Sequence, residues 1–250
     1  MAHLDRLSTL VSQMNVRGRR LVTVEDSNLA LIKEDGVAQR LDLYLSKPMA
    51  EASPIDARLK VELDLGGAQN PLFMALPPCL SVDLAKAPHI ASIAALIESE
   101  SAGLRCGGGI ALDRLCGLLV INLLRLQIEK NDAKTGVFAG LAHPKLNRVL
   151  VAMHDQPERH WQVDDFLPIA GMSRSQFMAE FLAVVGRSPM AYLKSWRMTV
   201  AQGALLEGAR VNETARRIGY ASGDAFTRAF VASFGVSPKA FVAQQAQTPA

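Results

Sequence analysis

Apolar residues recur along this chain of 250 residues at two different spacings. Between residues 19 and 82, runs such as Leu41–Leu45 and Leu59–Leu65 place an apolar residue at every second position, which predicts β-strands. From Ile90 onward the apolar residues recur every three or four positions, which predicts two helices. Their expected inward faces are Ile90, Ile93, Ala94 and Ile97 in the first helix, and Leu112, Leu115, Cys116, Leu119, Leu123 and Leu126 in the second. The second helix is apolar around more than half of its circumference, so its own domain or a partner subunit must cover it, and dimerisation is a hypothesis.

The segment between Val163 and Phe241 repeats itself. Val163 lies eight residues before Gly171, and Val211 lies eight residues before Gly219. Beyond these glycines the offset between the two copies changes from 48 to 49 residues. The matching residues there are Phe177, Phe181, Gly186, Ser188, Pro189 and Tyr192 in the first copy, and Phe226, Phe230, Gly235, Ser237, Pro238 and Phe241 in the second. Matches in this number indicate a repeat.

Each copy has the pattern of a helix-turn-helix unit. A short helix is followed by a glycine where φ is expected to be positive, and then by a second helix that a serine opens. Gly186 and Gly235 are expected to end these second helices, and Ser188 caps one long helix, Pro189–Leu206, between the copies. That helix would hold the two units at a fixed distance, and two reading helices roughly 34 Å apart can reach successive major grooves of DNA.

The polar, glycine-containing stretch 131–140 precedes a new helical pattern at Pro144–Met153 and marks a domain boundary. We therefore predict an α+β protein with an N-terminal β domain and dimerisation helices over residues 1–130, and a linker over 131–142. An all-α domain over residues 143–250 would contain the two helix-turn-helix units and the long linker helix.

The net charge of +3 is small, but it is unevenly distributed. Residues 143–250 contain 12 Lys and Arg against 8 Asp and Glu, whereas residues 1–142 contain 15 against 16. The C-terminal part therefore carries the positive charge expected of a surface that contacts phosphates.

The longest largely apolar run, Leu115–Leu124, which contains Asn122, is about half as long as a membrane span. The N-terminus shows no basic segment leading into an apolar one, so no secretory signal is predicted. Cys79, Cys106 and Cys116 lack the spacing of zinc or redox sites, which fits a reducing compartment. We therefore expect a cytoplasmic protein that makes no membrane contact.

Three stretches of the C-terminal part carry a specific signature. They are Ala170-Gly171-Met172-Ser173-Arg174-Ser175, Ser188-Pro189-x-x-Tyr192-Leu193-x-x-Trp196-Arg197-Met198, and Phe226-x-Arg228-Ala229-Phe230-x-x-x-Phe234-Gly235-x-Ser237-Pro238. Together they closely resemble the DNA-binding domain of the AraC/XylS family of transcription regulators. The segments Leu76–Pro78, Leu141–Pro144 and His154–Val163 are similar to family members whose N-terminal half is a cupin-like effector domain. Because the strand region is short for a complete cupin barrel, a partial one is expected.

The resemblance implies a sequence-specific transcription regulator that binds double-stranded promoter DNA under the control of a small-molecule effector. We expect this regulator to dimerise through its N-terminal half, with RNA polymerase as a further candidate partner. The residues expected to contact DNA are Arg174, Ser175, Met178 and Ala179 in the first unit, and Ser222, Gly223, Asp224, Thr227 and Arg228 in the second. Among them, Arg228 has the planar donors that suit a guanine or a phosphate.

Several positions depart from the family's pattern. Where the family usually has basic residues, this chain has Ala179, Glu180, Leu182, Val231 and Ala232. Glu180 would repel phosphate, Pro168 removes a backbone donor from the first helix of the first unit, and Thr214 stands where an apolar residue is usual. We therefore predict specific but modest DNA affinity. The alternative is a regulator-like protein that has lost strong DNA contact and acts through protein partners.

Residues 1–130 contain only His3 and His89, too few histidines for the metal site of a cupin, so no metal or other cofactor is expected. The sequence Arg17-Gly18-Arg19-Arg20, expected to precede the first strand, could clamp an anionic nucleotide as effector with Arg17, Arg19 and Arg20. It loosely resembles the arginine motif of PilZ-type receptors for cyclic di-GMP, although its spacing differs and the companion motif is missing. A solvated basic turn and a contact with acidic groups of a partner are the alternatives.

Catalysis has no candidate residues, because no G-x-S-x-G, G-K-[ST] or H-E-x-x-H motif occurs, and an enzyme is not expected. His154, His160 and Trp161 precede the first helix-turn-helix unit and are expected to pack between the domains.

Overall fold

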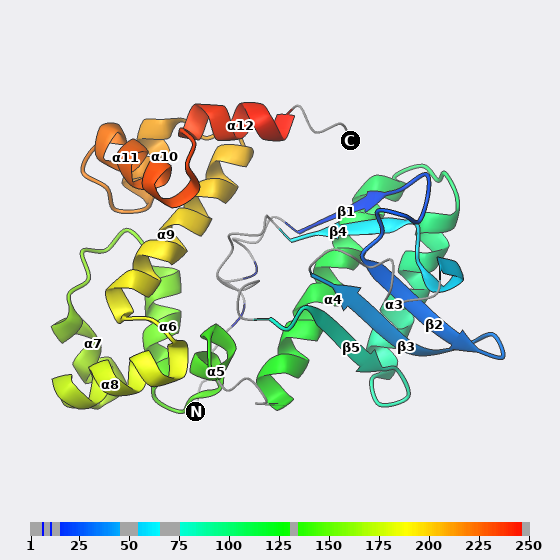
Figure 1. The fold of residues 1–250 in the computed structure, drawn as a ribbon, viewed down its shortest axis with the longest axis horizontal. Coiled ribbons are helices and arrows are strands. Elements are labelled where there is room, and N and C mark those ends of the chain that lie inside the picture. The colour runs from blue at the N-terminus through cyan, green and yellow to red at the C-terminus, as the bar shows by residue number, and fades with distance from the viewer. Residues whose placement is uncertain are drawn as a thin grey trace. The chain divides into compact units, whose positions relative to one another are not determined.

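The computed structural model of the chain describes residues 7, 11, 16–45, 55–65, 76–130 and 135–246 (Figure 1). These residues belong to two compact units, and each unit is described by itself. The N-terminal unit contains the described residues from 16 to 127, and the C-terminal unit contains those from 128 onward together with 7 and 11. None of the described helices is long and apolar enough to cross a membrane.

The N-terminal unit has two small antiparallel sheets, one with the strand order β2-β3-β5 and one that pairs β1 with β4. The strands are β1 (Arg17–Arg20), β2 (Leu29–Glu34), β3 (Val37–Tyr44), β4 (Val61–Asp64) and β5 (Cys79–Asp83), with a short 3-10 helix, η2 (Ile55–Ala57), before β4. Asp35 and Gly36 both have positive φ and close the β2–β3 hairpin, as a two-residue turn requires. The two alternating runs predicted as strands are confirmed, because Leu41–Leu45 overlaps the second half of β3 and Leu59–Leu65 contains β4.

Two helices complete the N-terminal unit, as the apolar spacing predicts. They are α3 (Pro88–Ala102) and α4 (Gly108–Lys130). The predicted inward face of α3 is buried, and most of the predicted face of α4 is buried as well, with Leu115 and Leu126 half-buried. The side chain of Leu118 on α4 is 45% exposed. Dimerisation through this helix stays a prediction.

The C-terminal unit is all helical in its described part. Its helices are α5 (Val137–Ala142), α6 (Leu146–Asp155), α7 (Val163–Ala170), α8 (Arg174–Val185), α9 (Pro189–Leu206), α10 (Val211–Arg217), α11 (Gly223–Phe234) and α12 (Pro238–Ala246). The predicted long helix is confirmed with the same bounds as α9, which runs from the α7–α8 pair to the α10–α11 pair (Figure 1). The side chain of Trp196 at the centre of α9 is fully buried. Because α9 packs against both α8 and α10, one shared helix supports both helix pairs.

Two local predictions differ from the structure. Arg17–Arg20 does not precede the first strand but forms it, because it pairs with β4. The described part of the predicted linker contains α5, which buries Phe138 and Leu141 and packs against α6 and α8, and the domain bounds stay a prediction. His154 and Trp161 pack within the C-terminal unit and not between domains, since their ring partners belong to the same unit.

Candidate nucleic-acid interface

The helix pairs α7–α8 and α10–α11 are helix-turn-helix units, because the same local signals occur in both. The turn glycines Gly171 and Gly219 have φ angles of 62° and 78°, which glycine adopts without steric strain. Ser173 and Ser222 cap α8 and α11, and each hydroxyl oxygen accepts the backbone N–H three residues further on. The predicted turns and caps are confirmed.

The second helix of each unit buries one side and exposes the other. Phe177 and Phe181 in α8, like Phe226 and Phe230 in α11, are fully buried. Since these residues are four apart, they share one helical side, and the opposite side of each helix faces solvent. We call these exposed sides the reading faces. The first reading face is formed by Ser175, Ala179 and Leu182, and the second by Asp224, Arg228 and Val231.

The first reading face carries no charge of its own. Ser175 and Ala179 are exposed on it, and Met178 is half-buried at its edge. Arg174 is exposed at the start of α8, where its guanidinium donates to the Asp164 carboxylate over 2.5 Å. An exposed pair of this kind adds little stability and can exchange one acceptor for another. The first unit therefore offers small and apolar groups, with one cation beside them.

Glu180, the acidic residue of α8, lies at the side of the first reading face. Its carboxylate is 2.9 Å from Nε2 of His143. The other ring nitrogen of His143, Nδ1, accepts the backbone N–H groups of Lys145 and Leu146 at the start of α6. The imidazole ring of His143 therefore links the start of α6 to α8. It also pairs with the Glu180 carboxylate, the group that the sequence predicts would repel phosphate.

The second reading face is charged. Arg228 is exposed and forms no ion pair with any residue that the structure describes, and Asp224 is exposed four residues before it. Thr227 is half-buried at the edge of this face. Gly223 is explained by packing, because a Cβ atom there would lie 2.0 Å from Oδ1 of Asn212. Arg228 is thus the predicted contact residue with the most available donors.

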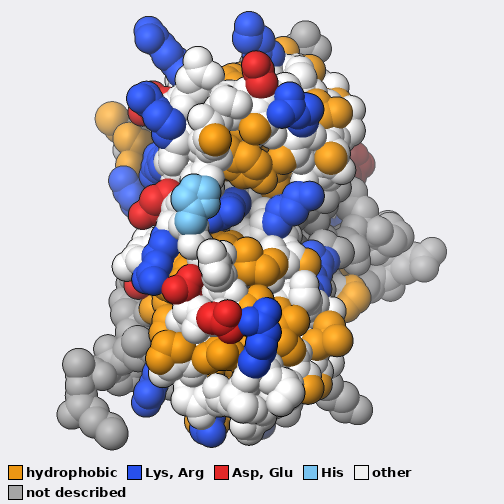
Figure 2. All heavy atoms as spheres, turned by 90° about the vertical axis from the view of Figure 1, so that its left-hand side faces the viewer, with side chains coloured by type: hydrophobic (Ala, Val, Ile, Leu, Met, Phe, Trp, Pro, Cys, Tyr) orange, Lys and Arg blue, Asp and Glu red, His pale blue; other side chains and the backbone are white. Residues whose placement is uncertain are grey.

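The positive charge of the C-terminal unit is concentrated in its second half. Residues 143–187 contain five Lys and Arg and five Asp and Glu, whereas residues 188–250 contain seven against three. Figure 2 views this unit from the side of α7 and α10. Several Lys and Arg side chains surround apolar ones in the upper half, where α10 to α12 lie, and apolar side chains cover more of the lower half. A polyanion would be attracted mainly to the second helix-turn-helix unit, α10–α11.

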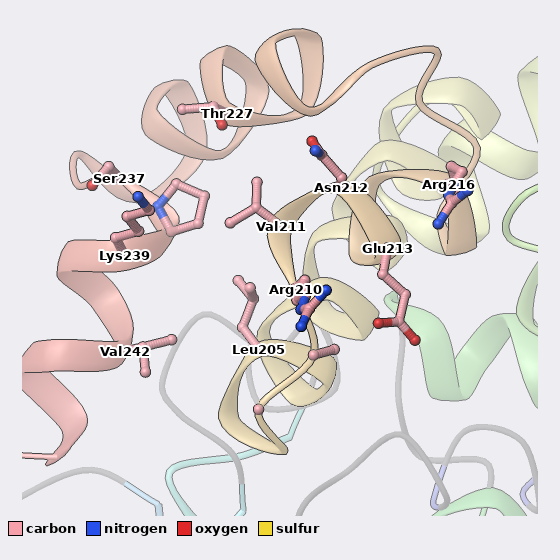
Figure 3. A pocket seen from close by; sticks show the side chains of 13 residues that line it. Leu205, Arg210, Val211, Asn212, Glu213, Arg216, Thr227, Ser237, Lys239 and Val242 are labelled. Atoms are coloured by element: carbon pink, nitrogen blue, oxygen red, sulfur yellow. The ribbon is translucent and has the colours of Figure 1, made fainter.

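An open cleft of about 930 Å³ lies beside α11 (Figure 3). Its apolar lining includes Leu205, Val211 and Val242, and its charged lining consists of Arg210, Glu213, Arg216 and Lys239. Thr227 of α11 also lines it, so cations from around α10 and α12 lie beside the second reading face. Sequence reasoning missed these cations, because nothing local in three separate helices shows that they share one cleft.

The loop between α6 and α7 contacts both α9 and the turn of the second helix-turn-helix unit. Arg197 of α9 donates to the carbonyl oxygens of Pro157 and Arg159 over 2.6 and 2.8 Å. The turn of the second unit lies against the same loop, since a Cβ atom at Gly219 would be only 2.4 Å from the carbonyl oxygen of Glu158. Together with α9, this loop fixes the orientation of one unit against the other.

A buried polar pair links α6 and α9. His154 Nε2 and the Tyr192 hydroxyl are 2.7 Å apart, and the His154 ring lies 4.5 Å from the ring of Trp196. Burial lowers the pKa of His154 to about 3, and burial raises the pKa of Tyr192. Both side chains are therefore neutral near pH 7.

Comparisons with known proteins agree with this geometry. A family model described as a helix-turn-helix domain matches residues 168–244, and one described as cupin matches residues 60–129. An AraC-like transcription regulator of Streptomyces lividans is 34% identical over 176 residues, which are 68% of this chain and 58% of that protein. The chain belongs to the AraC family. It is also 30% identical to the transcriptional regulator AlkR of Acinetobacter baylyi over 188 residues, which are 73% of this chain and 60% of AlkR.

This AraC-family chain thus spans about three fifths of the length of these two relatives. Among solved structures, an AraC-type regulator from Chromobacterium violaceum is 26% identical with a TM-score of 0.40, covering 43% of this chain and 97% of that one.

In the cupin-like part, the candidate effector residues lie on β1. Successive side chains of a strand point to opposite sides, so Arg17 and Arg19 share one side and Arg20 lies on the other. Arg19 is paired with Glu62 of β4, and the Arg20 guanidinium donates to the main-chain carbonyl of Glu100. The strand therefore does not bring all three guanidinium groups to one side.

Gly18 has a packing role between these arginines. Its N–H donates to the Asp113 carboxylate over 2.9 Å, and a Cβ atom at this position would lie 2.6 Å from the Cys116 sulfur. The glycine therefore lets β1 approach α4 closely.

A polar cluster on β3 and β5 is a further feature that the alternating pattern did not reveal. The side chain of Asp42 is buried and accepts hydrogen bonds from Arg40 Nε at 3.1 Å and from the Ser81 hydroxyl at 2.7 Å. These residues are neighbours across the sheet, since Asp42 pairs with Ser81. Arg40 and Ser81 therefore satisfy the buried carboxylate of Asp42.

Proposed function

We propose that this chain is a transcription regulator that binds double-stranded promoter DNA with both helix-turn-helix units, and whose cupin-like part binds a small-molecule effector. The observation that carries the proposal is the pair of helix-turn-helix units on one buried helix, α9, each with an exposed reading face. A helix of 18 residues is about 27 Å long, and the loop bound by Arg197 restrains it further, so the two units can address successive major grooves.

The second unit is proposed to supply most of the affinity. Arg228 extends from its reading face to a guanine or a phosphate, and Arg210, Arg216 and Lys239 of the adjacent cleft contact the phosphate backbone. The first unit, whose reading face is uncharged, contributes shape and apolar contacts. This division supports specific binding of modest strength, in which each lost cation has a measurable effect.

The remaining expectations are proposed in the same sense. The domains are 1–130, 131–142 and 143–250, the protein acts as a homodimer in the cytoplasm, and RNA polymerase is a partner of the DNA-bound form. The effector is a small molecule held by the cupin-like part, with cyclic di-GMP as one candidate for Arg17, Arg19 and Arg20. The cupin match over residues 60–129 supports the effector domain.

The test of DNA binding is selection of duplexes from a randomised pool by the full chain, followed by titration of the selected duplex at several salt concentrations. We expect an enriched sequence and a linear fall of log K with log salt. Arg228→Ala should weaken binding at least tenfold, whereas the control Lys60→Ala, which removes an exposed cation from the N-terminal unit, should not. A folded protein without selection or salt dependence would favour the alternative, a regulator that acts through protein partners.

The test of the effector is calorimetric unfolding of the full chain with sugars, aromatic acids and cyclic di-GMP, because a ligand that binds only the folded state raises the unfolding temperature. A shift with cyclic di-GMP that Arg17→Ala abolishes and Asp42→Asn leaves intact would assign the arginine site. The opposite pattern would assign the ligand to the β3–β5 cluster.

A further inference from the structure

Both reading faces expose an aliphatic side chain at the same position of the repeat. Leu182 of α8 is 55% exposed and Val231 of α11 is 40% exposed. They are separated by 49 residues, the offset that relates Phe177 to Phe226 and Phe181 to Phe230, and each is the ninth residue of its helix. A single exposed aliphatic residue needs no explanation, but the same exposure at equivalent positions of two units does.

These two residues belong to the stripe of a reading helix that reaches base edges. In the homeodomain, a helix-turn-helix variant, the base contacts of the helix in the major groove come from positions spaced as i, i+3, i+4 and i+7. Counted from Ser175, that stripe ends at Leu182, and counted from Asp224 it ends at Val231. The residues between are Met178 and Ala179 in the first unit, and Thr227 and Arg228 in the second.

The major groove offers one apolar group to such a side chain, the 5-methyl group of thymine. We propose that Leu182 and Val231 each contact a thymine methyl group, so that the two units read thymine at matching positions of successive major grooves. This proposal rests on the proposed DNA binding and adds to it the base that each unit recognises. It also gives a role to two positions where the family usually has basic residues. An aliphatic side chain there cannot attract phosphate, but it can contact a base in the major groove.

The test uses uracil, which lacks only the methyl group of thymine and keeps its hydrogen-bonding groups. The full chain first selects duplexes from a randomised pool, and we expect thymine at two positions about 10 base pairs apart. Each thymine is then replaced by uracil, and binding is measured by fluorescence anisotropy. Loss of one buried methyl contact should weaken binding by the wild-type chain about three- to fivefold.

The variants Leu182→Ala and Val231→Ala decide between recognition and coincidence. Each should lose the sensitivity to uracil at its own position and keep it at the other position. Val22→Ala is a matched control, because Val22 is 91% exposed in the N-terminal unit and should leave both sensitivities unchanged. Unfolding temperatures close to that of the wild type would show that the variants are folded.

Two results would overturn the proposal. If the alanine variants retain the wild-type response to uracil, these side chains do not contact the methyl groups. If the wild-type chain selects a sequence without thymine at the paired positions, the inference fails while the proposed DNA binding stands. A folded wild-type chain that selects no sequence would refute the proposed function and the inference together.

Discussion

Replacing Gly219 by alanine should destabilise the C-terminal unit far more than the same change at Gly171. The two glycines occupy equivalent turns and both have positive φ, 78° and 62°. Alanine in that conformation costs about 1 to 2 kcal/mol at either position. At Gly171 the added Cβ would meet no atom within 4 Å among the described residues beyond its chain neighbours, so that cost is the whole effect.

At Gly219 the added Cβ atom would lie 2.4 Å from the backbone carbonyl oxygen of Glu158. A backbone atom cannot rotate away, so the loop between α6 and α7 must move, which costs about a further 1 to 3 kcal/mol. We therefore expect about 2 to 5 kcal/mol of lost stability for Gly219→Ala. For a unit of this size, about 4 °C per kcal/mol predicts a drop of roughly 8 to 20 °C, against roughly 4 to 8 °C for Gly171→Ala.

Tryptophan fluorescence is the suitable assay, because Trp161 and Trp196 are the only two tryptophans of the chain and both are buried in the C-terminal unit. Asparagine variants separate the two costs, since asparagine tolerates positive φ but still carries a Cβ atom. Gly171→Asn should unfold close to the wild-type temperature, and Gly219→Asn should stay strongly destabilised. Equal losses at the two glycines would refute the packing of the second turn against the Glu158 loop.

Three further predictions concern charge, pH and packing. Ala179→Arg places a cation where the second unit has Arg228, so DNA binding should tighten severalfold and the slope of log K against log salt should steepen by about one; an unchanged slope contradicts this. The pKa of His154 is lowered from 6.5 to about 3, so the unfolded chain binds a proton between these values that the folded chain does not. Stability of the C-terminal unit should therefore fall by roughly 1.4 kcal/mol per pH unit as pH drops below 6.5, and the urea midpoint of His154→Gln should lack this part of the pH dependence. Thr214→Val should raise the unfolding temperature, because the Thr214 hydroxyl is buried without a hydrogen-bond partner among the described residues, and removing it should gain about 1 kcal/mol; a lower temperature would count against this reasoning.

The sequence by itself determined the helix-turn-helix repeat and the bounds of α9. Ser188 begins this helix and Gly186 ends the one before it through interactions within a few residues, and such local interactions can be read from spacing. The inward Phe177 and Phe226 follow from helical periodicity in the same way. The same periodicity indicates that the side of each helix opposite these phenylalanines is exposed.

Tertiary structure decided how residues far apart in sequence meet. The contact of Glu180 with His143, the approach of Gly219 to Glu158 and the cleft beside α11 each join separate helices. Pairing with β4 likewise makes Arg17–Arg20 a strand, although four residues with three arginines carry no strand periodicity. Periodicity states which side of an element is buried, but not the partner or the angle at which it packs. Those depend on complementary side-chain shapes across the whole unit, and they place the charges that a ligand or DNA would meet.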